Sequence, residues 1–216
     1  METYKEICMN ELEKIKNLLT YTVTSGKSYN GRNHETGYHT LNINGTVLPG
    51  QRKPGMRLET VNYDFTNKTV LDIGSNQGGM LFEVADKIKY GIGIDFDPRL
   101  VNVANRISNT NNYNIDFYNF NLDKEDFNLI NSLCRENKID VVFLLAVCMW
   151  IKPWRELVTW VSKNSSHCLF ETNGKSKQQS EQIEYLNKTF RSVEMLAESS
   201  EDDPKQKKRK LLWCSS

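Results

Sequence analysis

Strand-like and helix-like segments alternate from residue 69 to residue 189 of this 216-residue chain, and this order limits the possible folds more than any other feature. Apolar runs with strand character cover residues 69–73, 91–95, 115–120, 140–147 and 167–172. Between and after them, stretches with helical spacing cover residues 78–89, 98–108, 124–136, 153–161 and 177–189. Such alternation predicts an α/β fold, a doubly wound parallel sheet with helices on both faces. The strand at 140–147, which is apolar throughout after Asp140, suits the centre of that sheet.

Different patterns flank this core. Residues 5–20 carry leucine and isoleucine at helical spacing, which predicts an amphipathic N-terminal helix. The following segment is rich in glycine and polar clusters, a composition typical of loops and short strands. Segments 191–199 and 208–216 have strand character with no helix between them, so we expect an antiparallel pair. We therefore predict one compact domain, in which residues 1–60 form a helix and a substrate-binding lid and residues 61–216 form the core.

Charge and composition argue against several classes of protein. The formal net charge is +1, so no overall field favours nucleic acid or an anionic membrane as a partner. The longest apolar run, Val141–Ile151, is well below the roughly 20 residues that span a bilayer, and the N-terminus lacks the apolar core of a secretory signal. We therefore expect a cytoplasmic protein. Its five cysteines are scattered without a C-x-x-C pair, which predicts neither a disulfide framework nor a metal site.

A glycine-rich loop follows the first strand of the alternation, in the stretch VLDIGSNQGGM at Val70–Met80. Doubly wound sheets bind ligands beyond the carboxyl ends of their strands, where glycine lets the backbone approach the ligand. The second strand ends at Asp95, and a carboxylate there can accept hydrogen bonds from both hydroxyls of a ribose. These features predict a nucleoside-containing ligand. The order G-x-x-x-G-G, in place of G-x-G-x-x-G, disfavours NAD or FAD.

The glycine-rich loop, the stretch GIGIDFDPRLVNVA at 91–104 and the closing antiparallel pair resemble the class I S-adenosylmethionine-dependent methyltransferases, over about residues 60–216. The resemblance implies a Rossmann-like, seven-stranded, mostly parallel sheet with an antiparallel last strand, and S-adenosylmethionine as cofactor. It implies that Asp95 holds the ribose hydroxyls and that Phe96 lies against the adenine. Asn121 stands where many such families place an acidic residue against the adenine amino group. The other implied cofactor-binding residues are Asp72, Gly74, Ser75, Asn76, Gly78 and Leu122.

Methyl transfer from a sulfonium is an in-line displacement, so aligning the acceptor and excluding water supply much of the rate. A general base is needed chiefly when the acceptor is a hydroxyl or a protonated amine. The predicted catalytic residues are Glu171, at the end of the fifth strand, and His39 in the leader, with His34 as a further candidate. A carboxylate that only steadies the loop after it is the alternative for Glu171. Cys148, at the exit of the fourth strand, is interpreted as a packed thiol.

The leader between the first helix and the core combines basic and aromatic residues. We predict that it closes over the cofactor and binds an acceptor that carries phosphate or carboxylate, because the planar fork of arginine bonds two oxygens at once. The predicted substrate-binding residues are Tyr38, Arg52, Lys53 and Arg57, with Trp150 after the fourth strand. A solvated surface loop is the alternative for the leader, and packing against the following helix is the alternative for Trp150.

The leading hypothesis is methyl transfer to oxygen or nitrogen of a small anionic metabolite or an activated sugar, such as a phosphoramidate-type capsule building block. The polysaccharide-tailoring part rests on a likeness of GYHTLNI, GQRKPGMRL and FETNG to bacterial tailoring methyltransferases. An RNA methyltransferase is an alternative, with the leader and the cluster KQKKRK at 205–210 as a basic track. A non-catalytic cofactor-binding module is another. Because EDD precedes the basic cluster, we interpret residues 205–210 as part of a solvated hairpin.

Overall fold

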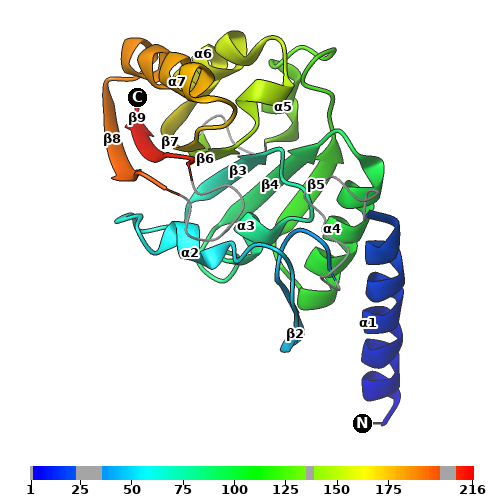
Figure 1. The fold of residues 1–216 in the computed structure, drawn as a ribbon. Coiled ribbons are helices and arrows are strands. Elements are labelled where there is room, and N and C mark those ends of the chain that lie inside the picture. Colours follow the sequence, from blue (N-terminus) through cyan, green and yellow to red (C-terminus); the bar gives the residue numbers. More distant parts are fainter. Residues whose placement is uncertain (1, 23–35, 135–138, 200–207) are drawn as a thin grey trace.

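The computed structural model describes residues 2–22, 36–134, 139–199 and 208–216, and for residues 2–10 only the backbone of a helix. A seven-stranded sheet forms its centre, in the order β5-β4-β3-β6-β7-β9-β8 (Figure 1). Strands β3 to β7 are parallel, whereas β9 is antiparallel to both β7 and β8. The predicted α/β sheet with an antiparallel last strand is thereby confirmed. The strands are β3 (Thr69–Ile73), β4 (Tyr90–Asp95), β5 (Ile115–Asn119), β6 (Ile139–Leu145), β7 (Ser165–Glu171), β8 (Ser192–Ala197) and β9 (Leu211–Ser215).

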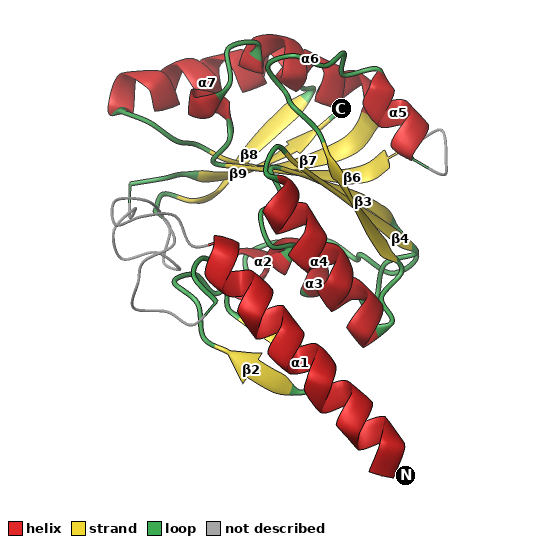
Figure 2. Cartoon of the chain, turned by 90° about the vertical axis from the view of Figure 1, so that its right-hand side faces the viewer, coloured by secondary structure: helices red, strands yellow, loops and turns green. Residues whose placement is uncertain are grey.

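Helices cover both faces of this sheet (Figure 2). One face carries α5 (Leu129–Leu133), α6 (Trp154–Asn164) and α7 (Ser176–Thr189). The other face carries α2 (Gly55–Leu58), α3 (Gly79–Phe82) and α4 (Pro98–Asn111). The N-terminal helix α1 (Glu2–Thr22) packs on the outer side of α4. No helix in the described part of the chain is both long enough and apolar enough to cross a membrane.

The central strand β6 explains how one apolar run serves two cores. Successive side chains of a strand point to opposite faces of the sheet. Val142 and Leu144 therefore join the cluster beneath α6 and α7, and Val141 and Phe143 join the cluster on the α3 and α4 side. All four side chains are buried. Burial on both faces is the reason that this run shows no alternation of apolar and polar residues.

Local signals set the limits of the helices. The Asp97 side chain accepts a 2.9 Å hydrogen bond from the backbone N–H of Arg99, and Pro98 takes the first position of α4. The helices predicted at 78–89 and 124–136 are shorter in the structure. After α3 the chain continues in turns closed by bonds between residues three apart. Before α5, the side chains of Asn121 and Asp126 accept bonds from backbone N–H groups two residues later, which competes with a helix.

The leader contributes a small core of its own. Strands β1 (Leu41–Ile43) and β2 (Thr46–Leu48) form a hairpin through Asn44 and Gly45, which both have left-handed backbone angles. Apolar side chains of α1 and of this hairpin pack together on α4: Ile15, Leu19, Leu41, Ile43, Leu48, Val103 and Ile107. The part of the leader that carries β1 and β2 is therefore folded against the core.

Candidate functional site

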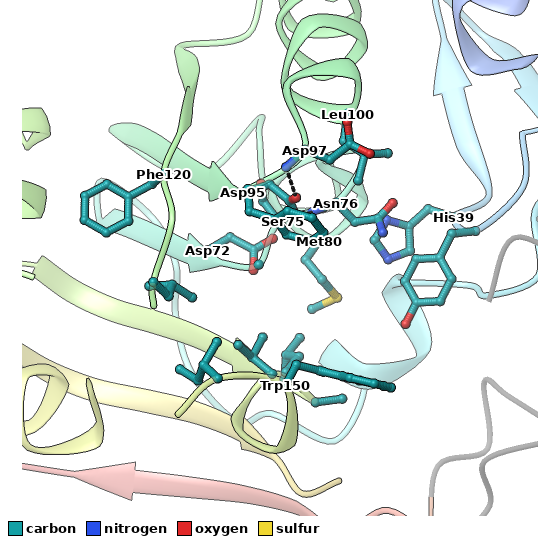
Figure 3. Close-up of a pocket in the computed structure, with 18 of the residues that line it drawn as sticks. His39, Asp72, Ser75, Asn76, Met80, Asp95, Asp97, Leu100, Phe120 and Trp150 are labelled. Carbon is teal, nitrogen blue, oxygen red and sulfur yellow. Dashed lines mark hydrogen bonds between the residues drawn. The ribbon is translucent and has the colours of Figure 1, made fainter. Parts of the chain in front are cut away.

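A cavity of about 550 Å³ lies at the carboxyl ends of β3, β4 and β6. Figure 3 shows Phe120 and His39 at opposite ends of it, with Trp150 on the wall that faces Asp72 and Asp95. Its volume is in the range of small-molecule sites. Lys53, Arg52, Gly78 and Glu171 do not line it. The other predicted residues do: Tyr38, His39, Arg57, Asp72, Gly74, Ser75, Asn76, Asp95, Phe96, Asn121, Leu122 and Trp150.

The loop after β3 needs its glycines for different reasons. Gly74 and Gly78 both have left-handed backbone angles, with φ of 77° and 83°. A Cβ at Gly74 would come within 2.7 Å of the side chain of Val147, which also lines the cavity. A Cβ at Gly78 would come within 2.5 Å of the Phe117 ring, on the far side of the loop. Gly74 thus lets the loop lie close to Val147 in the cavity lining, and Gly78 lets the loop pack on β5 without lining the cavity.

The Asp95 carboxylate is held at the end of β4 by two backbone donors. The N–H of Asn76 donates to Oδ2 at 2.9 Å, and the N–H of Asp97 donates to Oδ1 at 3.0 Å. Burial raises the pKa of Asp95, and these hydrogen bonds act in the opposite direction. The next residue, Phe96, also lines the cavity and is 73% exposed. A fixed carboxylate therefore lies beside an accessible aromatic ring.

A second carboxyl group, that of Asp72, faces the same cavity. It is buried, and this burial, together with the charge of Asp95, raises its pKa to about 8. The Asp72 carboxyl is therefore mostly protonated at neutral pH in the ligand-free protein. A bound cationic group would favour its ionised form.

Three guanidinium groups converge on the buried Glu171 carboxylate. Arg52 Nη1 and Nη2 lie 3.3 Å from its two oxygens, Arg57 Nη2 lies 2.8 Å from Oε2, and Arg209 Nη1 lies 3.8 Å from Oε1. The Tyr38 ring lies over Arg52, with 5.6 Å between the guanidinium carbon and the ring centroid. Arg57 and Arg209 line the cavity, whereas Arg52 and Glu171 lie behind them. The cluster fixes two cationic side chains in the cavity wall.

Arg209 was missed in the sequence. The interpretation of residues 205–210 as a solvated hairpin is wrong for Arg209, which is only 5% exposed; residues 205–207 lie outside the described part of the chain. Arg209 precedes β9, whose first residue Leu211 is also buried. The period-two alternation of a strand is the signal that could have placed the Arg209 side chain on the inner face.

His39 lies at the leader end of the cavity. Its backbone N–H donates to the side chain of Gln77 at 3.1 Å. Burial, with a smaller effect of the nearby Arg52 charge, lowers the pKa of the imidazole to about 3. The ring is therefore neutral at physiological pH. His34, the other leader histidine considered as a base, lies outside the described residues.

The exit of β6 forms the wall opposite the carboxylates. Ala146 has a left-handed backbone angle, φ 59°, which is unusual for alanine. The side chain of Asn173 fixes it there, because its amide nitrogen donates to the Ala146 carbonyl and its Oδ1 accepts from Met149 N–H at 3.0 Å. Cys148 is buried in the core, and burial raises its pKa, as expected for a packed thiol. Further lining residues that were not predicted are Thr22, Met80, Asp97, Leu100, Phe120, Asp123, Leu145, Ala146, Val147 and Ile151.

Comparison with known proteins adds independent findings. A family model described as a methyltransferase domain matches residues 64–210. The N-terminal domain of EvdMO1, solved in the presence of SAH (S-adenosylhomocysteine) and D-fucose, superposes with a TM-score of 0.66 at 10% identity, over 94% of this chain and 96% of that one. The bifunctional kinase-methyltransferase WbdD superposes with a TM-score of 0.65 at 16% identity, over 91% of this chain and 46% of that one. No curated protein matches the sequence.

The family model and the geometry agree on the same part of the molecule. The matched residues contain every strand of the sheet from β3 to β8, together with the glycine loop, Asp95 and the exit of β6. The solved structures share the fold at low sequence identity. The chain therefore belongs to the methyltransferase-domain family, and it has the Rossmann-like fold of the class I S-adenosylmethionine-dependent methyltransferases.

Proposed function

We propose that this protein transfers a methyl group from S-adenosylmethionine to an oxygen or nitrogen of a small anionic acceptor. One observation carries the proposal: Arg57 and Arg209 line the same cavity as Asp95 and the glycine loop. Cationic side chains beside a cofactor site suit an acceptor that carries phosphate or carboxylate. An activated sugar of the kind used in polysaccharide tailoring is one such acceptor.

In this proposal the cofactor occupies the end of the cavity formed by β3, β4 and the segment after β5. Asp95 accepts hydrogen bonds from the ribose hydroxyls, and Phe96 lies against the adenine, with Asn121 and Leu122 nearby. Asp72 and the loop Gly74–Asn76 contact the methionine part, where the cationic amino group and sulfonium favour an ionised Asp72. When bound, S-adenosylmethionine supplies the methyl group. The protein aligns the acceptor with it and excludes water.

The acceptor then occupies the end formed by the leader and by the exit of β6. Arg57 and Arg209, held by Glu171, bind its anionic group, while Tyr38 and Trp150 provide the flanking walls. Arg52 acts from behind through the same carboxylate. Lys53 is exposed and outside the cavity, so it has the weakest support among the predicted substrate-binding residues. The presence of D-fucose in one of the EvdMO1 structures is consistent with a sugar-related acceptor.

Of the two predicted bases, His39 has the stronger support. Its imidazole lines the cavity, and because burial lowers its pKa to about 3, it acts as a base only where the bound anionic acceptor raises that pKa. The Glu171 carboxylate is fully buried outside the cavity and is engaged with three arginines. We therefore propose that Glu171 positions the arginines and that His39 takes the proton.

The test is a methylation screen with S-adenosylmethionine and a panel of sugar phosphates, uronic acids and small phosphorylated metabolites, with release of SAH as the readout. Arg57→Gln and Arg209→Gln should each raise the KM for an active acceptor about tenfold to a hundredfold, as expected for a lost charge-assisted bond, and leave SAH affinity unchanged. Arg155→Gln is the control, because Arg155 is exposed on α6 outside the cavity. Equal KM values for all three variants would contradict the anion site.

The screen also separates the alternatives. A bulk RNA acceptor whose binding weakens steeply with salt would favour an RNA methyltransferase, because counterion release governs binding to a phosphate backbone. SAH binding without turnover of any acceptor in the panel would favour the non-catalytic module.

A further inference from the structure

A single buried side chain ties the cofactor loop to the leader. Gln77 belongs to the loop after β3 and has 0% exposure. Its Oε1 accepts the backbone N–H of His39 at 3.1 Å. Its Nε2 donates to the carbonyl oxygen of Thr36 at 2.6 Å and to Oγ1 of Thr22 at 3.1 Å. One amide group thus bonds to three partners that lie 38 to 55 positions away in the sequence.

These partners come from two separate segments, the end of α1 and the leader. Thr22 is the last residue of α1, whereas Thr36 and His39 belong to the segment that leads into β1. Thr36 also bonds through its hydroxyl to the carbonyl oxygen of His39, so residues 36–39 form a closed turn. Gln77 therefore holds both the end of α1 and this turn against the cofactor loop.

The two sides of this connection face different parts of the cavity. On the leader side, Thr22, Tyr38 and His39 line the proposed acceptor end. On the loop side, Asn76 precedes Gln77, lines the cavity and bonds to Asp95. Figure 3 shows Asn76 and His39 as neighbours in the same wall. The hydrogen bonds of Gln77 therefore connect the loop at Asn76 to the acceptor wall.

We propose that Gln77 is a positioning residue that couples cofactor binding to the ordering of the acceptor wall at residues 36–39. This inference rests on the proposed function. A cofactor that settles on Gly74–Asn76 fixes Gln77, and the amide of Gln77 fixes the turn that carries Tyr38 and His39. Cofactor binding thereby reduces the motion of an acceptor wall whose hydrogen bonds to Gln77 are already formed. Burying an amide group without hydrogen-bond partners would destabilise the fold. The three hydrogen bonds of the Gln77 amide offset that free-energy cost.

Hydrogen–deuterium exchange of the full chain tests the coupling without knowledge of the acceptor. The probe is SAH, and its binding is first verified by calorimetry. In the wild type, saturating SAH should slow exchange in the peptide that covers residues 36–41 by about tenfold, a usual size for coupling between two sites. The peptide that covers the loop 74–79 should be protected as well, because it contacts the ligand directly.

Gln77→Met keeps the size of the side chain and removes its hydrogen bonds. In this variant SAH should still protect residues 74–79, while the protection of residues 36–41 should be lost. Gln182→Met is the matched control: Gln182 is another buried glutamine, bonded to Asn173 through its oxygen at 3.0 Å and its nitrogen at 3.1 Å, and it makes no hydrogen bond to the described part of the leader. Its substitution should leave the response of residues 36–41 intact. If Gln77→Met does not fold, Thr22→Val removes one of the three bonds and should reduce the response.

The outcomes separate this inference from the proposed function. Absence of SAH binding to the folded wild type would overturn the proposed function and the coupling with it. Normal SAH binding without any protection of residues 36–41 in the wild type would overturn the coupling alone. Full protection of residues 36–41 in Gln77→Met would also overturn it.

Discussion

The backbone N–H of Asn76 donates a 2.9 Å hydrogen bond to Oδ2 of Asp95, which joins the loop after β3 to the end of β4. These two strands are neighbours in the parallel part of the sheet, so their carboxyl ends meet at one edge. The bond fixes the orientation of the carboxylate before any ligand arrives. It also makes Asp95 the residue whose removal should affect the cofactor site most directly.

We expect Asp95→Ala to weaken SAH binding about tenfold to a hundredfold, because a charge-assisted contact worth about 1.5–3 kcal/mol is lost. Calorimetric titration measures the change. Asp86→Ala is the control, since Asp86 is exposed and lies outside the cavity, and its affinity for SAH should match the wild type. An unchanged affinity in Asp95→Ala would place the ribose elsewhere.

The raised pKa of Asp72 predicts a pH dependence of stability. An aspartate in the unfolded chain has a pKa of about 4. Burial raises the pKa of Asp72 in the folded protein to about 8. Between these values the folded state holds a proton that the unfolded state has lost, so the contribution of Asp72 to the free energy of unfolding falls as pH rises. Asp72→Asn removes this contribution and should become more stable relative to the wild type as pH rises from about 5 to about 8.

Urea denaturation of both proteins without ligand measures this difference. Burial also raises the pKa of Asp95, but that residue is present in both proteins, so the comparison isolates Asp72 to a first approximation. Parallel pH profiles for the two proteins would show that Asp72 is ionised in the folded state.

The arginine cluster predicts that Glu171→Gln is strongly destabilising. Removing one partner of a buried ion pair leaves uncompensated charge, which typically costs about 3–5 kcal/mol. Glu181→Gln is the matched control, because its 3.7 Å pair with Arg155 is partly exposed and should contribute less than about 1 kcal/mol. Denaturant unfolding of the two variants gives the comparison, and equal losses would argue against the buried cluster.

The contact between α3 and the leader can be tested at Gly79. A Cβ there would come within 2.7 Å of Cγ and Nδ1 of His39, so Gly79→Ala should displace the imidazole and cost about 1–3 kcal/mol. Gly45→Ala meets no atom within 4 Å, and only its left-handed backbone angle opposes it. NMR of the His39 ring protons should therefore show a shift in Gly79→Ala and none in Gly45→Ala.

The sequence predicted the sheet and the position of the cofactor loop because their signals are local. Strand periodicity, the glycines after β3 and the aspartate at the end of β4 lie within about 25 consecutive residues, where spacing alone carries the information. The confirmed class I fold follows from these signals. The predicted lengths of α3 and α5 were less accurate. Turns closed by bonds between residues three apart follow α3, and turns closed by side-chain hydrogen bonds precede α5, where helix was predicted.

The proposed acceptor end of the cavity was only partly predictable from the sequence. Arg57 and Glu171 were both singled out, but no spacing rule indicates that they form an ion pair across 114 positions (171 minus 57). Arg209 stands in a run of basic residues, which we interpret from the sequence as solvated. Its burial depends on the register of β9 against β7. Gln77 has no sequence signal at all, since a glutamine in a polar loop usually points to solvent.

The order β7-β9-β8 has a consequence for how the chain is made on the ribosome. In the sheet, β8 pairs with β9, so β8 has no place to dock until β9 has been synthesised. Until then β7 remains an unpaired sheet edge, which is open to pairing with other chains. Arg209 reaches Glu171 at the same late moment. Closing the sheet and completing the arginine cluster therefore follow the synthesis of every other strand of this sheet, and they depend on contacts of long sequence separation, which form slowly.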